Sequence, residues 1–321
     1  MSVKSRPLLV ITGPTGIGKT DLAMALGSEL PIRVISADSA MVYRFLDIGS
    51  AKPTAEELLK CPHDLIDLVP PEHPFDVSQF VKYAAKFIHS AWANGQVPCL
   101  VGGTIMYLKS LLDGLDTLPG ADPIIREQVR LKAESEGWPA VHAWLRSLDQ
   151  EAADLIHPNH SSRIERALEV RLITGKSICS LWSGIDAQPS ICGQVVDLSV
   201  LVLVPSDREQ LKDRLNWRFD SMLRRGFEGE VEDLRERPEL TPDYPSMRSV
   251  GYRQMWQYLD GNLSKDEMTD QAKASTRQLA KRQLTWLRSW RADTNTFIEV
   301  SKSIPFEKGR AWLSGALDRV L

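Results

Sequence analysis

The sequence predicts an α/β fold built on a doubly wound parallel sheet. Short apolar runs rich in Val, Ile and Leu recur without clean alternation, at residues 8–12, 33–38, 65–69, 97–103 and 198–204. Such runs are typical of parallel strands that are buried on both faces. Helix-like segments, such as residues 76–95, lie between the earlier runs. Alternation of strands and helices predicts a sheet with helices on both of its faces.

The pattern changes between residues 116 and 197, where it becomes helical before the last apolar run begins. We expect this stretch to be an inserted helical subdomain. Residues 1–115 and 198–321 then form the α/β core, which ends in a helical C-terminal part. The length of 321 residues, with 43% hydrophobic and 25% charged residues, suits globular domains of this size.

Composition argues against several other classes of protein. The net charge of −3 gives no global sign of nucleic-acid binding. The cysteines are scattered without a CxxC pair, which argues against a disulfide or zinc framework and fits a reducing cytosol. No apolar run approaches the ~20 residues that a membrane span needs. We therefore expect a cytoplasmic protein with no membrane association.

A glycine-rich loop, GPTGIGKT, follows the first apolar run and precedes the helix-like segment DLAMALGSEL. It matches the phosphate-binding pattern GxxxxGK[ST] in the strand–loop–helix context that the pattern requires. Glycines let successive N–H groups point inward, and the helix adds its positive N-terminal end. Lys19 supplies a charge between phosphates, and the Thr20 hydroxyl suits a Mg²⁺ ligand. The fold is therefore predicted to be P-loop NTPase-like, with phosphates held by Gly13, Pro14, Thr15, Gly16, Ile17, Gly18, Lys19 and Thr20.

A carboxylate, Asp38, follows the second apolar run. In a doubly wound sheet the carboxyl ends of the strands gather at one edge, where ligands bind. Asp38 should therefore lie near the phosphate loop. There it could bind Mg²⁺, cap a helix or act as a base, and the residue pattern alone leaves these alternatives open.

The segment 271–292 holds six Lys or Arg residues and no Asp or Glu, with Trp286 and Trp290 among them. Basic side chains can neutralise RNA phosphates, and aromatic rings can stack on bases. The alternative is a helix with a solvated basic face and tryptophans in the core. We expect both tryptophans in the core, and we interpret the acid-free basic face as a candidate RNA-binding surface.

Several motifs occur together in the order of a known family. This chain resembles the bacterial tRNA dimethylallyltransferases, also called tRNA isopentenyltransferases, from the phosphate loop to about Trp290. One motif departs slightly, because Ser50 stands where Thr is usual. The motifs are GPTGIGKT (13–20), SADSAMVYRFLDIGSAKP (36–53), VGGTIMYLKSLLDGL (101–115), RIERALEV (163–170), GYRQMWQYL (251–259) and TRQLAKRQLTWLRSW (276–290).

The resemblance implies that the loop holds the diphosphate of dimethylallyl diphosphate. The acceptor would be the adenosine immediately 3′ of the anticodon in tRNA, whose exocyclic amine attacks the allylic carbon. Asp38 matches the base of the family, and Thr20 would hold Mg²⁺. Lys19 and Arg218 would bind the diphosphate.

The resemblance also implies a set of tRNA contacts to the anticodon stem-loop. They belong to six segments of the chain. The residues are Asp38, Ser39, Ala40, Met41, Thr104, Arg126, Ser162, Arg163, Ile164, Glu165, Arg166, Arg248, Ser249, Val250, Gly251, Tyr252, Arg253, Lys281, Arg282, Gln283, Leu284, Thr285, Trp286, Leu287 and Arg288.

Three other hypotheses share part of this pattern. A P-loop kinase of a small metabolite or nucleotide shares the loop, but does not need the basic segment or the insert. A prenyltransferase acting on free adenine nucleotides shares the loop and Asp38. A non-enzymatic RNA-binding protein would not need the intact loop beside Asp38. We expect a tRNA-modifying enzyme, and a monomer is the simplest expectation.

Overall fold

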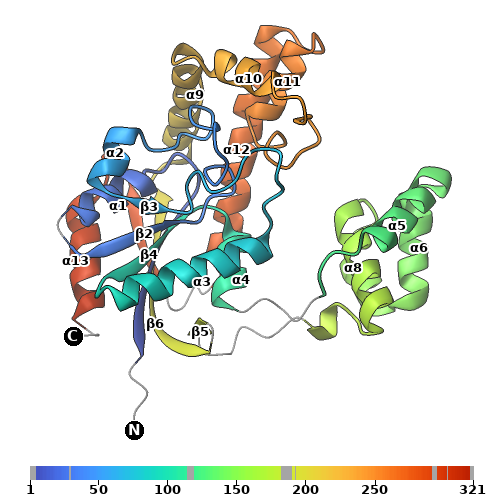
Figure 1. The fold of residues 1–321 in the computed structure, drawn as a ribbon, viewed down its shortest axis with the longest axis horizontal. Helices are drawn as coiled ribbons and strands as arrows, with labels where there is room; N and C mark the ends of the chain where they lie inside the picture. The colour runs from blue at the N-terminus through green and yellow to red at the C-terminus, as the bar shows by residue number, and fades with distance from the viewer. Residues whose placement is uncertain are drawn as a thin grey trace. The chain divides into compact units, whose positions relative to one another are not determined.

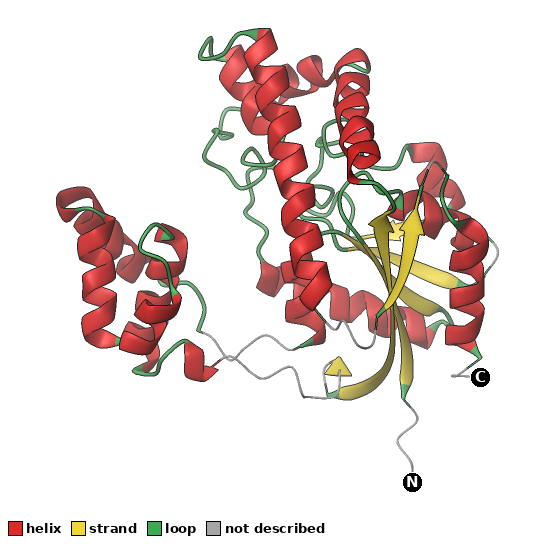
Figure 2. Ribbon diagram, turned by 180° about the vertical axis from the view of Figure 1, so that it is seen from behind, coloured by secondary structure: helices red, strands yellow, loops and turns green. Residues whose placement is uncertain are grey.

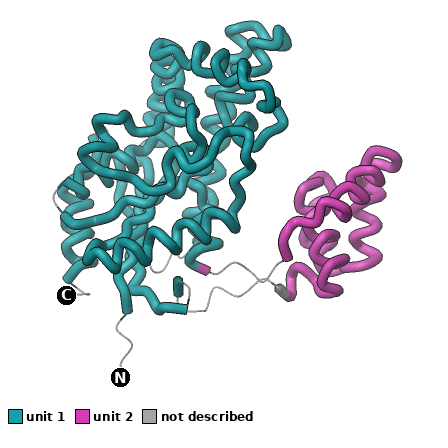
Figure 3. The backbone as a smooth tube through the Cα atoms, viewed as in Figure 1, with its two compact units in different colours: residues 1–112, 188–321 teal, residues 113–187 magenta. Residues whose placement is uncertain are grey.

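The computed structural model describes residues 5–28, 30–113, 119–181, 190–191, 193–290, 295–301 and 303–318. The chain divides into two compact units, one of residues 1–112 with 188–321 and the other of residues 113–187 (Figure 3). Hydrophobic clusters of buried side chains lie within each unit. None of the described helices is long and apolar enough to cross a membrane.

The larger unit is built around a sheet with strand order β3-β2-β4-β1-β6-β5, in which β7 also pairs with β6 (Figure 1). Every pairing is parallel except that of β5 with β6. The predicted fold class is therefore confirmed. The strands are β1 (Arg6–Thr12), β2 (Ile32–Ser36), β3 (His63–Asp64), β4 (Val97–Gly102), β5 (Ser190–Ile191), β6 (Gln194–Pro205) and β7 (Thr296–Val300).

Strand β1 shows why the apolar runs do not alternate. Leu8 and Val10 belong to one hydrophobic cluster, and Leu9 and Ile11 belong to another. The first cluster includes side chains of α3 (Val77–Ala93) and α4 (Ile105–Leu112). The second includes side chains of α1 (Lys19–Gly27) and α13 (Phe306–Leu317). Helices thus cover both faces of the sheet (Figure 2), and both sets of strand side chains are apolar.

The strand expected at residues 65–69 does not form. Strand β3 ends at Asp64, and the next residues include two with left-handed backbone, Leu65 at φ 63° and Asp67 at φ 52°. This conformation interrupts an extended chain. The buried ammonium of Lys52 donates to the Asp67 carboxylate at 2.6 Å, which helps to hold the segment in this shape.

Two other strands differ from the prediction: β6 is longer than expected, and β7 was not predicted. Strand β6 begins at Gln194, before the apolar run at 198–204, so the described sheet already includes residues that we expected in the insert. Strand β7 was missed because its sequence, TFIEV, is mixed. It lies at the edge of the sheet, where Phe297 is 43% exposed.

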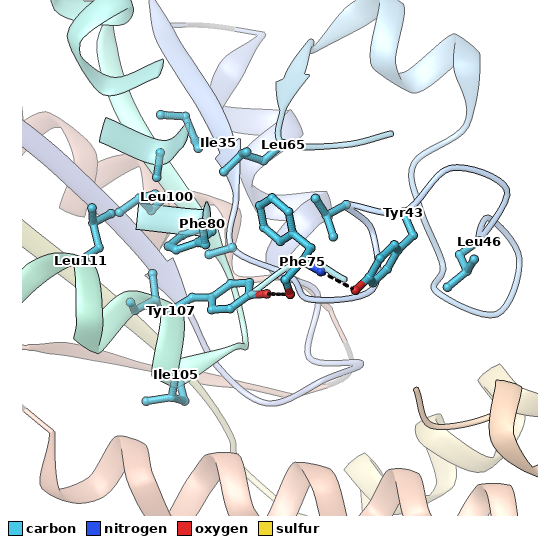
Figure 4. Packing of buried hydrophobic residues seen from close by; sticks show 14 of the residues in the cluster. Ile35, Tyr43, Leu46, Leu65, Phe75, Phe80, Leu100, Ile105, Tyr107 and Leu111 are labelled. Atoms are coloured by element: carbon cyan, nitrogen blue, oxygen red, sulfur yellow. Dashed lines mark hydrogen bonds between the residues drawn. The ribbon is translucent and has the colours of Figure 1, made fainter. Parts of the chain in front are cut away.

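An aromatic group connects the first cluster to the loop after β2 (Figure 4). Phe80 of α3 stacks on Tyr107 of α4, with ring centroids 4.3 Å apart. The Tyr107 hydroxyl donates to the carbonyl of Phe75, and the Phe75 N–H donates to the Tyr43 hydroxyl at 3.2 Å. Tyr43 lies in the loop that also carries Asp38, so the core helps to order this loop.

The C-terminal part of the larger unit is mainly helical, as predicted. Its long helix α12 packs against α4, α9 and α11. A capping box at Ser264 and Glu267 begins α12. The other helices of this unit, besides those already named, are α2 (Ala55–Lys60), α9 (Arg208–Arg224), α10 (Phe227–Arg235), α11 (Tyr252–Leu259) and α12 (Lys265–Ser289).

The smaller unit consists of helices around a core that includes Val129, Leu145, Ile164 and Leu168. Its helices begin at recognisable signals, such as Asp122 with Pro123 at the start of α5. The helices are α5 (Pro123–Glu136), α6 (Trp138–Leu148), α7 (Gln150–Leu155), α8 (Ser161–Thr174) and the 3₁₀ turn Cys179–Leu181.

Candidate active site

The phosphate loop lies between β1 and α1, as its pattern predicts. Gly16 and Gly18 have φ values of 72° and 100°, which favour glycine. A Cβ at Gly13 would lie 2.6 Å from the carbonyl oxygen of Leu203, so a side chain has no room there. The loop curls so tightly that the Lys19 ammonium donates to the Pro14 carbonyl at 2.8 Å.

The loop borders a cavity of about 570 Å³. Lys19, Thr20 and Asp21 come from the start of α1, while Arg214 and Arg218 come from α9. Cationic side chains and a helix N-terminus on one cavity make it suited to a phosphorylated ligand. The Arg214 guanidinium also donates to the carbonyls of Gly16 and Ile17, at 3.4 and 3.3 Å. Arg214 and the exposed Trp217 were missed by the sequence analysis.

Asp38 follows β2 and lies on this cavity, near the loop as expected. Its Oδ1 accepts from the backbone N–H groups of Ala40, at 2.8 Å, and Met41, at 3.4 Å. These bonds form a local turn that holds the carboxylate. Its Oδ2 accepts no hydrogen bond from the described residues.

The charges of Lys19, Asp38 and Arg218 influence one another. Burial lowers the pKa of Lys19 to about 8, while Asp38 acts to raise it and Arg218 to lower it. Burial also lowers the pKa of Arg218, against the opposing effect of Asp38. Two partly buried cations on the same cavities favour an anion as the occupant.

A second cavity, of about 430 Å³, also reaches this group. Thr15, Lys19, Asp38 and Arg218 border both cavities. The second has more apolar lining, including Leu215, Phe219, Met222, Ile105 and Met106. The larger unit therefore holds two adjoining cavities, which share Lys19 and Arg218. The second also carries Arg248 and Arg282, and it adds an apolar wall.

The second cavity brings together several predicted tRNA-contact segments of the larger unit. The Thr104 hydroxyl accepts from the Ser39 N–H at 3.1 Å, which joins the ends of β4 and β2. Met41 borders the first cavity instead. The predicted contacts on the second cavity are Asp38, Ser39, Ala40, Thr104, Arg248, Ser249, Val250, Gly251, Tyr252, Arg282, Gln283 and Trp286.

Helix α12 presents some predicted contacts to solvent and buries others. Lys281, Arg282, Thr285 and Arg288 are exposed. Leu287 is buried in the first hydrophobic cluster, Leu284 packs against the second, and the Gln283 side chain is buried too. Their side chains contact the protein itself rather than lie on an open surface.

The two tryptophans of α12 differ. Trp290 is 3% exposed, which confirms its predicted place in the core. Trp286 is 48% exposed, so the expectation of burial was wrong. Trp286 stands on the helix face that borders the second cavity, where the Lys109 ammonium lies 5.9 Å from its ring centroid. It is placed to present an aromatic face beside a cation.

In the smaller unit, Arg126 and Arg166 are both tied to a buried carboxylate. Glu169 is fully buried and accepts from the Arg126 guanidinium at 2.8 Å, from the Arg166 guanidinium and from the Asp122 N–H at 2.8 Å. Ile164 lies in the core, whereas Ser162 and Arg163 are exposed and Glu165 is half-buried. Arg126 and Arg166 therefore have a structural role whatever else they contact.

Glu230 of α10 is a residue that the sequence analysis missed. Its carboxylate accepts from the N–H groups of Asp47, Ile48 and Gly49, at 3.0, 2.6 and 3.1 Å, and from the Tyr252 hydroxyl at 2.6 Å. Gly49 borders the second cavity. No local pattern could have revealed this contact, because Glu230 and Ile48 are 182 residues apart in sequence.

Comparison with known proteins places the chain in a family. The family model described as IPP transferase matches residues 41–290, and one described as isopentenyl transferase matches residues 7–68. The chain belongs to the IPP transferase family. The predicted family, that of the tRNA dimethylallyltransferases, is thereby confirmed, and the enzyme class expected from the sequence is confirmed with it.

Curated relatives and solved structures agree with this membership. The tRNA dimethylallyltransferase 2 of Hahella chejuensis (strain KCTC 2396) is 47% identical, over 88% of each chain. The tRNA dimethylallyltransferase of Azoarcus sp. (strain BH72) is 44% identical, over 93% of this chain and 92% of that one. The full-length tRNA isopentenylpyrophosphate transferase of Bacillus halodurans superposes with a TM-score of 0.70 at 34% identity, over 98% of each chain.

A eukaryotic dimethylallyltransferase acting on tRNA is also similar in structure. Its TM-score is 0.79 at 25% identity, over 98% of this chain and 79% of that one. Similar structures over nearly the whole of this chain indicate that both the sheet and the helical additions belong to the family fold.

Proposed function

We propose that this protein transfers the dimethylallyl group from dimethylallyl diphosphate to the exocyclic amine of the adenosine immediately 3′ of the anticodon in tRNA. The observation that supports it best is the pair of adjoining cavities. The first cavity, at the phosphate loop, suits a diphosphate, and the apolar wall of the second suits a prenyl chain and a base. Asp38 and Lys19 lie on both, where the reacting groups would meet.

The donor would bind with its diphosphate in the phosphate loop. Lys19 and Arg218 would neutralise the charge that grows on the diphosphate as the bond to the allylic carbon breaks. Because these cations are held in place before reaction, they need little reorganisation in the transition state. The allylic carbon would then point toward the second cavity.

Asp38 would serve as the general base. The amine of adenine is a weak nucleophile because its lone pair is delocalised into the ring. As the amine nitrogen bonds to the allylic carbon, its proton would pass to the Asp38 carboxylate and diphosphate would leave. The target base has to leave the anticodon stack to reach this carboxylate.

The site fits Mg²⁺ bound jointly with a diphosphate. Magnesium in phosphate loops is held by one or two protein oxygens together with substrate phosphates and water. Thr20, in the first turn of α1, and Asp21 border the first cavity. The described residues hold no cluster of three His, Cys, Asp or Glu side chains that could bind a metal alone. Magnesium bound here would further neutralise the leaving diphosphate.

The RNA would approach the second cavity across exposed cations. Arg248, Lys281, Arg282 and Arg288 are exposed, and Trp286 offers a ring for stacking. Arg163 of the smaller unit is a further exposed candidate. Phosphate contacts of this kind give salt-dependent affinity, while the cavity selects the base.

The proposal is tested by mass spectrometry. The protein is mixed with Mg²⁺, dimethylallyl diphosphate and an unmodified anticodon stem-loop with two adenosines on the 3′ side of the anticodon. One control replaces the donor with ATP, and another replaces the RNA with AMP. We expect a dimethylallyl mass gain on the RNA alone. Phosphate transfer from ATP would support the kinase hypothesis instead, and a mass gain on AMP would support a prenyltransferase of free nucleotides.

Replacing Thr20 by Ala is expected to raise the Mg²⁺ concentration needed for half-maximal activity by about tenfold or more, the scale typical of losses around metal sites. The Thr20→Ser variant keeps the hydroxyl and should behave nearly as the wild type. The measurement is initial rate against Mg²⁺ concentration at saturating donor. Equal Mg²⁺ dependence in all three proteins would remove Thr20 from the metal site.

The pKa of Lys19, about 8, predicts a pH dependence of donor capture. Only the protonated ammonium attracts the diphosphate, so kcat/KM for the donor should fall as pH rises through about 8. This ratio reports the ionisation of the free enzyme. In a Lys19→Met variant kcat/KM should be lower, and this descending limb should be absent. If kcat/KM for the donor falls above pH 8 in the variant just as in the wild type, the fall arises from another ionisable group.

A further inference from the structure

Gln283 of α12 bridges two loops at the edge of the sheet. Its amide oxygen accepts from the Thr15 N–H at 2.8 Å, and its amide nitrogen donates to the Gly103 carbonyl at 2.8 Å. Thr15 belongs to the phosphate loop after β1, and Gly103 follows β4. One buried side chain thus joins the ends of two neighbouring strands.

These loops meet closely at Gly103. A Cβ there would lie 2.6 Å from the Gln283 amide nitrogen, 3.2 Å from the Gly13 carbonyl oxygen and 3.4 Å from the Lys19 ammonium. The Thr15 N–H is directed to Gln283, so it is not a donor to the phosphate. Gln283 therefore shapes the cradle from outside instead of touching its ligand.

The bridged residues belong to different parts of the site. Thr15 borders both cavities, whereas Gly103 borders the second, next to Thr104. The distance between the two loops sets how far the diphosphate cradle lies from the place of the acceptor base. We propose that Gln283 is a positioning residue that fixes this distance. The inference rests on the proposed function, because it concerns the alignment of that donor with that acceptor.

The bridge needs a neutral amide of this length. Glutamine offers an acceptor and a donor at the end of the same side chain. Glutamate could accept from Thr15 but, when ionised, would place a carboxylate against the Gly103 carbonyl. Leucine has neither group and would leave the Thr15 N–H and the buried Gly103 carbonyl without this partner, which is unfavourable for polar groups away from water.

A loss of alignment has a chemical consequence. Dimethylallyl diphosphate can also react with water at its allylic carbon. The bond from that carbon to the diphosphate oxygen then breaks, and a bond to the water oxygen forms. The proton passes to solvent, and the products are diphosphate and dimethylallyl alcohol. Poor alignment of the amine should increase this side reaction relative to transfer to RNA.

The test compares Gln283→Leu with wild type at saturating donor and stem-loop RNA. Released diphosphate and prenylated RNA are measured in the same reaction. We expect kcat for prenylation to fall by about 10- to 100-fold, the scale of a misplacement of about 1 Å, with a smaller change in KM for the donor. The ratio of diphosphate to prenylated RNA, close to one in the wild type, should rise. This ratio does not depend on how much of the protein is folded.

Gln254→Leu is the matched control. Gln254 is also buried, and its amide likewise accepts from one N–H, that of Gly251, and donates to one oxygen, that of Ser275. It does not contact the phosphate loop. We expect this variant to keep the wild-type product ratio. If Gln283→Leu yields no folded protein, the same ratio is measured for Gln283→Glu, which keeps the acceptor for Thr15.

The outcomes separate the inference from the proposed function. An unchanged product ratio in the Gln283 variant, with kcat reduced no more than in Gln254→Leu, would overturn the positioning role. A raised ratio confined to the Gln283 variant supports it. Failure of the wild type to prenylate the RNA would reject the proposed function itself, and that result is visible before any variant is examined.

Discussion

Replacing Asp38 by Asn is expected to reduce the rate of prenyl transfer in single turnover by about 10²- to 10⁴-fold, the usual contribution of a general base. The asparagine side chain can still accept from Ala40 and Met41, so the turn after β2 should persist. It cannot take the proton of the attacking amine. RNA affinity and thermal stability should therefore stay close to those of the wild type.

Asp38→Ala is the companion variant. It removes the base and also the two hydrogen bonds of the turn, so it should lose additional activity or stability. The difference between the two variants separates proton transfer from the shape of the loop. Single-turnover measurement is needed because slow product release in steady state can hide a change in the chemical step.

The Asp38→Asn variant offers a second, independent signature. Asp38 acts to raise the pKa of Lys19. Removing its charge should lower the pKa of Lys19 below about 8, so the descending limb of kcat/KM for the donor should move to lower pH. A chemical rate within a few-fold of the wild type would show that Asp38 is not the base. If the chemical rate is unchanged but kcat/KM for the donor falls at a lower pH, Asp38 acts only through the effect of its charge on Lys19.

The fold could be predicted where a single local pattern carries the information. The apolar runs of β1, β2 and β4 identify strands because both of their faces are buried. The segment 65–69 is equally apolar but takes left-handed backbone at Leu65 and Asp67, and Lys52, from the loop before α2, holds Asp67. Strand β7 is mixed in sequence because it forms an edge. Both errors arise from tertiary context that periodicity does not contain.

The candidate site likewise contains residues that could be predicted from the sequence and residues that could not. The phosphate loop is contiguous, so its residues and their role could be predicted from the sequence. Asp38 could be placed at the correct edge of the sheet, although its role needed the family resemblance. The Gln283 bridge joins residues 268 apart in sequence, and Glu230 reaches its loop across more than 180 residues. Contacts at such separation leave no local signal.

The second large effect is expected in the smaller unit. Glu169→Gln should lower the opening free energy of that unit by about 2–3 kcal/mol, somewhat less than for a fully buried ion pair because Arg126 is partly exposed. Glutamine has nearly the same shape but leaves two guanidinium groups beside each other without a carboxylate. Native-state hydrogen exchange of amides in residues 119–181 measures the change, and amides of β1 and β4 serve as the internal reference.

Glu134→Gln is the matched control for this prediction. Glu134 pairs with Arg130 on the exposed face of α5 and is itself 58% exposed. Exposed pairs of this kind contribute about 0–1 kcal/mol. We expect hydrogen exchange in the smaller unit to be nearly unchanged in this variant, so that a general sensitivity to charge removal can be separated from the loss of the buried carboxylate.

The pH dependence of the Glu169 effect follows from its pKa. Burial acts to raise that pKa, but the hydrogen bonds from Arg126, Arg166 and Asp122 outweigh it and hold it below the ordinary value of 4.5. The group therefore contributes stability that is fully present above about 4.5 and is lost as pH falls through its lower value in the folded protein. The difference between wild type and Glu169→Gln should shrink in this acidic range. A difference that stays constant with pH would show that the negative charge of Glu169 is not what stabilises the smaller unit.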